Sequence, residues 1–414
     1  MSVSGSAWRL GDAGADTAMR EAAAAELARL IERARENDAD LATATADVAS
    51  AYRDLVAVDG FDRREVEAAA RAFAGPPVAD AVAGAGGVLD EAAVRAVLET
   101  QVLPVVFPPG AAEEHPTLVV VAGQPGAGQA RAIGRVASEY EGGMAVVRAG
   151  DLRAFYPPAA DPRRYDGARE EAVSTASAAW LQGCLGHARA ERRSMLLEGS
   201  FPNPGTVLAV ADRFAKEGFR TRLVLVGARR AESLLTLTSG YLRNVREGVP
   251  ATPVDRGAHE RAWEATLALA GDAETSTGVG RVSVLDRSGV VVFDGEGDRL
   301  GARAGLVAAE QRPLTVLQSA AWLGELRRVT EFARGLRNPP REVMESLLEL
   351  HQAAIREIVP ELPLPRDSDV ATVQLGRHAE QVVGLRRLLA PREAVDRAAP
   401  VVAVAGPERG GVSR

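Results

Sequence analysis

Hydrophobic residues follow two alternating patterns through the middle of the chain, and together the patterns predict a parallel α/β sheet. A continuous β-branched run, typical of a strand buried on both faces, occurs at 117–122, and further candidate strands occur at 144–147, 194–197 and 222–226. Segments with helical spacing lie between or after them, at 129–140, 168–191, 204–216 and 231–247. This alternation favours parallel pairing of the strands, with helices on both faces of the sheet.

Helical patterns also mark both ends of the chain. They occur at 16–57, 63–74, 90–102, 314–336, 341–358 and 369–389. Two further strands, 282–285 and 290–293, are joined by the turn residues Asp286-Arg287-Ser288-Gly289. We therefore expect an N-terminal helical region at 1–87, an α/β domain at 88–310, a C-terminal helical region at 311–400 and a flexible tail at 401–414.

Composition excludes several classes of protein. The 414 residues carry a net charge of −7, which argues against a general nucleic-acid binder. A single cysteine, Cys184, permits neither an internal disulfide nor a thiolate metal cage, and we expect it to be a buried helical thiol. The histidines are scattered, so no metal site is expected. We see no secretion signal and no apolar run of about 18 residues, so we expect a cytoplasmic chain without a membrane span.

Lys216 is the only lysine among the 49 lysine and arginine residues. It ends a predicted helix before Gly218, at the edge of the sheet where the next strand begins. Ligands of open α/β sheets bind at the opposite edge, beyond the carboxyl ends of the strands. We therefore expect Lys216 to be a solvated surface charge.

A glycine-rich stretch follows the first predicted strand, Gly123-Gln124-Pro125-Gly126-Ala127-Gly128-Gln129-Ala130. Its spacing matches the phosphate loop G-x-x-x-x-G-K-[ST], in which backbone amides and a helix N-terminus hold phosphate. The position of the phosphate-binding lysine is Gln129, and the position of the Mg²⁺-binding hydroxyl is Ala130.

Further motifs extend this likeness in chain order over about 90–310, and together they resemble the bacterial zeta toxins, P-loop kinases of UDP-N-acetylglucosamine. The motifs are Glu114-His115-Pro116 with the strand and loop after it, Asp151-Leu152-Arg153-Ala154-Phe155-Tyr156-Pro157, Leu196-Leu197-Glu198-Gly199-Ser200, 233–241, Ala258-His259-Glu260 and 284–289. The resemblance implies a P-loop kinase fold with nucleotide at 123–130. It also implies catalytic carboxylates at Asp151 and Glu198, substrate contacts at Arg153 and Ser200, and an antitoxin-like protein partner.

The chain departs from this family pattern at its charged positions. The family's catalytic aspartate falls on Gly150, one residue before Asp151, and two phosphate-binding arginines fall on Gly240 and Pro250. Glu198 alone keeps both its place and its chemistry. Each such loss typically costs about 10²–10³ in rate. These departures favour a pseudokinase that binds a nucleotide, a sugar nucleotide or a partner, and they make Mg²⁺ doubtful as a cofactor.

Two other functions stay open from the sequence. One is an active or weakly active ATP-dependent UDP-N-acetylglucosamine-type kinase that uses Asp151, Arg153 and Glu198. The other is an interaction protein whose terminal helices act while the P-loop domain is a scaffold. Single residues also have alternatives: Asp151 as a helix N-cap, Arg153 in an ion pair, and His259 as a helix-packing residue.

Overall fold

The computed structural model describes residues 88–107, 109–140, 144–157, 167–199, 201–248, 251–362 and 369–390. The predicted helices at 16–57 and 63–74, the N-terminal region 1–87 and the tail 401–414 lie outside these residues. No helix of the described part is long and apolar enough to cross a membrane.

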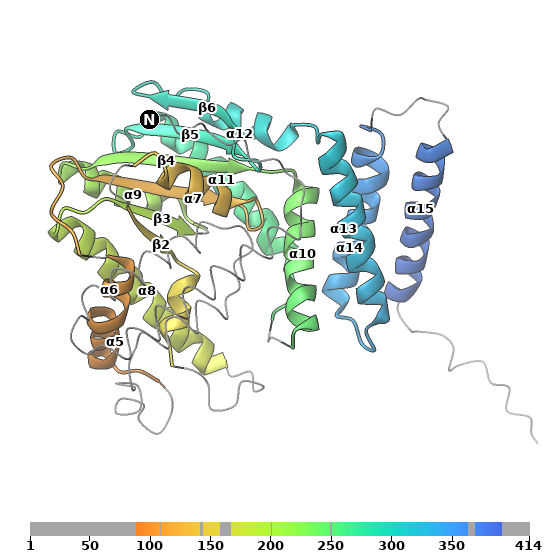
Figure 1. Ribbon diagram of the computed structural model, residues 1–414, viewed down its shortest axis with the longest axis horizontal. Coiled ribbons are helices and arrows are strands. Elements are labelled where there is room, and N and C mark those ends of the chain that lie inside the picture. Colours follow the sequence, from red (N-terminus) through yellow and green to blue (C-terminus); the bar gives the residue numbers. More distant parts are fainter. Residues whose placement is uncertain are drawn as a thin grey trace, which may run out of the picture.

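A six-stranded sheet in the order β2-β3-β1-β4-β5-β6 forms the centre of the fold (Figure 1). Every neighbouring pair is parallel except β5 and β6, which form the predicted antiparallel hairpin. The strands are β1 Thr117–Gly123, β2 Ala145–Arg148, β3 Met195–Gly199, β4 Arg220–Gly227, β5 Arg281–Asp286 and β6 Val291–Glu296. The sequence prediction of a mostly parallel α/β sheet is confirmed.

Helices flank this sheet and precede it. A continuous helical segment before β1 comprises α5 Glu91–Val97, the π-helical turn η1 Leu98–Val102 and α6 Leu103–Val106. The helices that connect or follow the strands are α7 Gln129–Ala137, the 3₁₀ turn η2 Asp151–Phe155, α8 Gly167–Ala190, α9 Pro204–Lys216, α10 Arg230–Arg246, α11 Arg256–Thr275 and α12 Ala302–Gln311. The sequence patterns did not predict α11 or α12.

Local sequence explains where several elements begin and end. All seven residues of β1 are buried, as its β-branched run requires. Helix α9 begins at Pro204 after the cap Asn203, whose side chain accepts the Gly205 amide at 3.0 Å. Gly218 follows its C-terminus with a φ of 84°, in the left-handed conformation that terminates helices.

A second hydrophobic core lies beside the first and is built around α10. Its C-terminal helices are α13 Val316–Gly335, α14 Arg341–Ala353 with the π-helical turn η3 Ala354–Ile358, and α15 Asp369–Leu389. Helix α10 stands between the sheet and these helices (Figure 1), and it contributes Leu234, Leu235 and Leu242 to their core. Trp322 Nε1 also donates to the Ala231 carbonyl at 3.1 Å. The C-terminal helices therefore pack on an element of the α/β domain.

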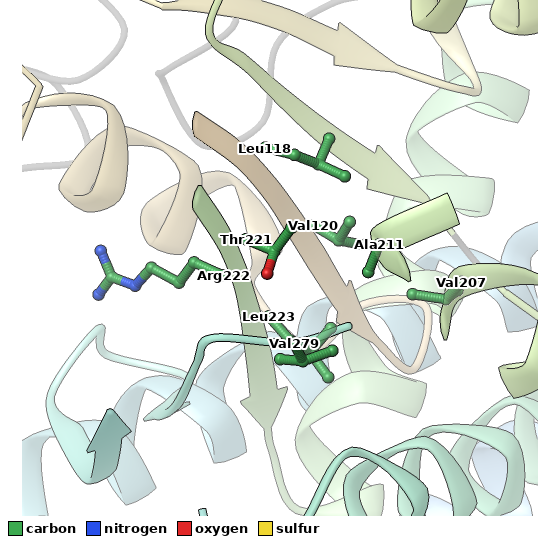
Figure 2. Close-up of a pocket in the computed structure, with 8 residues that line it drawn as sticks. All are labelled: Leu118, Val120, Val207, Ala211, Thr221, Arg222, Leu223 and Val279. Atoms are coloured by element: carbon green, nitrogen blue, oxygen red, sulfur yellow. The ribbon is translucent and has the colours of Figure 1, made fainter. Parts of the chain in front are cut away.

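A small apolar gap lies between α9 and the first halves of β1 and β4 (Figure 2). Its volume is about 10 Å³, roughly the space of one water molecule. Leu118 and Leu223 line it, whereas the Arg222 guanidinium points away from the other labelled side chains. The gap is a packing defect of the core, away from the carboxyl edge where β1 ends.

Candidate functional site

Two glycines after β1 have a backbone conformation that other residues avoid. Gly126 has a φ of 81° and Gly128 a φ of 95°, both left-handed. A Cβ atom at Gly126 would lie 2.5 Å from the Ser233 carbonyl oxygen, and one at Gly128 would lie 3.1 Å from the Arg287 carbonyl oxygen. The loop is therefore held closely between α10 and the β5–β6 turn, and α7 begins directly after it.

Backbone amides of this loop form a cradle. The amides of Gly126, Gly128, Gln129 and Ala130 have no hydrogen-bond acceptor among the described residues. Amides grouped at the N-terminus of a helix bind anions, because they are strong donors in a positive helix-end potential. The residues predicted to bind nucleotide, 123–130, therefore have a backbone arrangement that fits a phosphate group.

The two side chains that follow the glycines do not supply kinase chemistry. Gln129 Nε2 donates to the Gly123 carbonyl at 3.1 Å, so the side chain folds back over the start of the loop. Ala130 is buried and offers no oxygen. The loop therefore lacks both the ammonium and the hydroxyl of the family pattern, and its side chains do not fit a phosphate-bound Mg²⁺.

Gln124 connects the loop to α10 and, through it, to α11. Its Nε2 donates to the Ala228 carbonyl at 2.9 Å and to Ser233 Oγ at 3.1 Å. Ser233 Oγ lies 2.8 Å from His259 Nε2, and Arg230 Nη1 lies 3.5 Å from His259 Nδ1. Because a guanidinium only donates, Nδ1 accepts and the Nε2 hydrogen points to Ser233.

His259 is a buried packing residue, which confirms the packing interpretation of the sequence. It is 2% exposed. Burial, aided by the Arg230 charge, lowers the pKa of His259 to about 4, so the ring is neutral near pH 7. Its hydrogen bond to Ser233, which in turn bonds to Gln124, makes it a support of the loop that no sequence pattern predicted.

Two predicted carboxylates meet at one arginine. Arg148 Nε lies 3.3 Å from Glu198 Oε2 and 3.9 Å from Asp151 Oδ2. Arg148 and Glu198 are paired in register between β2 and β3, and Val121 of β1 pairs with Glu198 on the other side. The structure therefore brings Asp151 and Glu198 together near the carboxyl edge of the sheet, beside the strand that leads into the loop.

Arg148 is a site residue that the sequence analysis missed, although it directly follows the predicted strand 144–147. Burial raises the pKa of Glu198, and Asp151 raises it further, whereas pairing with Arg148 lowers it. The carboxylate of Glu198 is thus bound to a guanidinium within the protein.

The remaining predicted residues have mixed outcomes. Asp151 is the first residue of η2, and the N-cap is Gly150, so the N-cap interpretation of Asp151 is wrong. Arg153 Nη2 pairs with Glu170 Oε1 at 2.6 Å, which is the ion-pair alternative. Ser200 lies outside the described residues.

Two expectations about single side chains can be compared with the structure. Lys216 pairs with Asp212 at 2.6 Å and its side chain is 74% exposed, which confirms a solvated surface charge. Cys184 is a buried thiol on α8, as expected. Tyr156, in the motif that begins at Asp151, is a core residue whose hydroxyl accepts the Leu89 amide at 3.2 Å.

No group of three or more metal-ligating side chains lies together in the described ranges. At the carboxyl edge the structure places a glycine-rich loop after β1, with Glu198 on the neighbouring strand β3 and Asp151 on the 3₁₀ turn after β2. A family model described as "Zeta toxin" matches residues 108–298, which contain both features. The chain carries a zeta toxin domain.

A solved structure of the PezAT chromosomal toxin–antitoxin system of Streptococcus pneumoniae is similar to this chain with a TM-score of 0.51 and 14% identity. The match covers 60% of this chain and 98% of that chain. A structure of the AvrRxo1-ORF1:-ORF2 complex matches with a TM-score of 0.34 and 12% identity, over 64% of this chain and 80% of that one. Among curated protein sequences there is no significant match.

The first of these likenesses shows the fold, a P-loop kinase-like α/β domain. The matched residues end at 298, just after β6, so α12 to α15 lie beyond them.

Proposed function

We propose that this zeta-toxin-like protein is a cytoplasmic pseudokinase, which binds a nucleotide or sugar nucleotide at the loop 123–130 without efficient phosphoryl transfer. The observation that carries the proposal is the contrast within one loop. The backbone cradle of Gly126 and Gly128 is formed, while Gln129 bonds to the Gly123 carbonyl where a lysine would carry charge to phosphate.

Charge on the transferred phosphoryl group is what a kinase has to stabilise. At this site Ala130 has no metal-binding oxygen, and Arg148 binds Glu198. Losing even two of the usual groups lowers the rate by about 10⁴ or more when each contributes 10²–10³. Binding through backbone amides, by contrast, needs none of these side chains, so we expect binding without a requirement for Mg²⁺.

A protein partner is the second class of ligand that we propose. Its support is the similar structure from a toxin–antitoxin system. A second support is that α13, α14 and α15, which pack on α10, extend the chain beyond the zeta toxin domain. An antitoxin-like partner would therefore be sought by co-purification with the full chain.

Ligand binding is tested by thermal shift with ATP, GTP and UDP-N-acetylglucosamine, each with and without Mg²⁺. A ligand at 100 times its Kd adds about 2.7 kcal/mol to the unfolding free energy, which raises the melting temperature by several degrees. Gly128→Ala should abolish this shift, because the substitution is strained at a φ of 95° and its Cβ crowds Arg287. Gly218→Ala is the matched control, with a φ of 84° and its nearest contact at 4.0 Å.

Turnover is tested with the same protein, ATP, Mg²⁺ and UDP-N-acetylglucosamine. We expect no phosphorylated sugar nucleotide above the background without protein. Product that disappears with Glu198→Gln would show an active kinase and overturn the pseudokinase proposal. The absence of any shift with all three ligands would overturn ligand binding.

A further inference from the structure

A cationic side chain reaches the loop from the turn between β5 and β6. Arg287 Nη1 donates to the Gly126 carbonyl at 2.5 Å, and its Cγ would lie 3.2 Å from a Cβ at Gly128. The side chain therefore runs along the two left-handed glycines of the cradle. Neither the phosphate-loop pattern nor the family motif at 284–289 pointed to this contact.

Hydrogen bonds of Asp286 close the turn that carries Arg287. Asp286 Oδ1 accepts the Ser288 and Val290 amides, each at 2.9 Å, and Asp286 Oδ2 pairs with Arg312 at 2.5 Å. An aspartate that accepts amides two and four residues ahead fixes a tight turn. The backbone of Arg287 is thus positioned independently of any ligand.

The guanidinium is also oriented by α10. Its Nη2 donates to Thr236 Oγ1 at 2.8 Å, and its Nε lies 3.8 Å from Glu232 Oε1. A guanidinium held in this way loses little further conformational entropy when it meets a ligand, and its planar fork matches the oxygens of phosphate.

The place of this charge matters because Gln129 does not provide one. The Arg287 side chain contacts Gly126 and Gly128 of the loop that carries these amides, so a phosphate bound there would lie near both the amide dipoles and a guanidinium. We propose that Arg287 supplies the cation of this phosphate loop in place of a lysine at 129, and that the loop takes a phosphate chain such as that of a nucleoside diphosphate or triphosphate. This inference rests on the proposed function, since it concerns the same loop.

The test is calorimetric titration of the full chain with inorganic pyrophosphate, ATP and adenosine at low and high salt. For Arg287→Gln we expect at least a tenfold loss of affinity for pyrophosphate and ATP, with a weaker dependence on salt, because a screened charge has been removed. Arg287→Lys should keep most of the salt dependence, since it keeps the charge. A residue that only shaped the loop would not produce this difference between glutamine and lysine.

Arg281→Gln is the matched control. It removes an arginine from the other end of β5, where the guanidinium pairs with Asp294 at 2.6 Å, and it should bind as the wild type does. If Arg287→Gln lowers the melting temperature without ligand, its loss of affinity could come from a damaged fold. The salt dependence of binding by Arg287→Lys then shows whether the charge at position 287 contributes to binding.

Several outcomes would overturn the inference. One is that Arg287→Gln binds pyrophosphate as tightly as the wild type does. Another is that Arg287→Gln binds it more tightly, which would show that the contact from Arg287 to Gly126 closes the loop. A third is that Arg287→Lys loses the salt dependence. If the wild type binds ATP and Gly128→Ala does not, while Arg287→Gln is unaffected, only this inference fails. If the wild type binds neither pyrophosphate nor any nucleotide, the proposed function fails with it.

Discussion

Two histidines form a buried hydrogen-bonded pair in the second core. His351 Nδ1 lies 2.8 Å from His378 Nδ1, and the two residues are 2% and 6% exposed. Thr330 Oγ1 donates to the Leu326 carbonyl at 2.7 Å and lies 3.0 Å from His351 Nε2. The Nε2 of His351 therefore carries its hydrogen, and its Nδ1 accepts from His378. A second proton on His351 could be accepted by His378 only if His378 moved its own hydrogen from Nδ1 to Nε2.

Acid should consequently weaken the fold. Burial, with His378 and Arg334 facing the ring, lowers the pKa of His351 to about 3. The unfolded chain has an ordinary histidine pKa near 6.5, so it takes up this proton first and stability is lost as the pH falls below about 6.5. Between pH 7.5 and 4.5 the loss from this one group is about 2.5 kcal/mol. That is a large part of the usual unfolding free energy of roughly 5–15 kcal/mol.

Urea unfolding at both pH values measures this loss. In His351→Gln the side-chain oxygen can accept from His378 and the amide can donate to Thr330, so the titrating group is removed while hydrogen-bonding capacity remains. The wild type should lose about 2.5 kcal/mol more than this variant over the interval. His115→Gln, which replaces an exposed histidine before β1, should lose as much as the wild type. An equal loss in the wild type and His351→Gln would refute the reasoning.

Two further predictions concern the cores. Leu347→Ala removes a side chain of the second core that is 0% exposed, so it should lower the unfolding free energy, measured by urea unfolding, by about 2–5 kcal/mol. The control Val316→Ala, at a position 56% exposed, should change this free energy by less than about 0.5 kcal/mol. Burial raises the pKa of Cys184 to about 12, so the thiol of the native chain should resist a thiol reagent near pH 8. In denaturant the chain should react once, at its single cysteine. Rapid labelling of the folded protein would contradict this burial.

The elements that sequence patterns predicted are those with a strong local signal. Strand β1 is an unbroken β-branched run, and α9 has both an Asn203 cap and Gly218 after its end, so its predicted bounds match. Helix α11 was missed because much of its buried face is small: Ala270 and Ala273 are 0% exposed but give little apolar contrast. Such a helix is identified by packing against its neighbours, which a local pattern does not contain.

The site divides in a similar way. The loop glycines were predicted because their spacing matches the phosphate-loop pattern, and Glu198 was predicted because it matches a motif of the zeta toxin family. Arg148 and Arg287 were missed because their partners are 50 and 161 residues away in sequence. Long arginine side chains choose partners through the fold, and in a chain rich in arginine no spacing distinguishes these two.

Lack of space does not explain why glycine stands at positions 150 and 240, where the family pattern has charged residues. A Cβ at Gly150 or Gly240, where the family motif has aspartate and arginine, would meet no heavy atom of the described residues within 4 Å. The loop itself is held by contacts inside the protein, from Gln124 to Ser233 and from Arg287 to Gly126. Its shape therefore does not depend on the groups that transfer phosphate. A fold arranged in this way can lose phosphoryl transfer and still keep a phosphate cradle, because separate residues maintain the two properties.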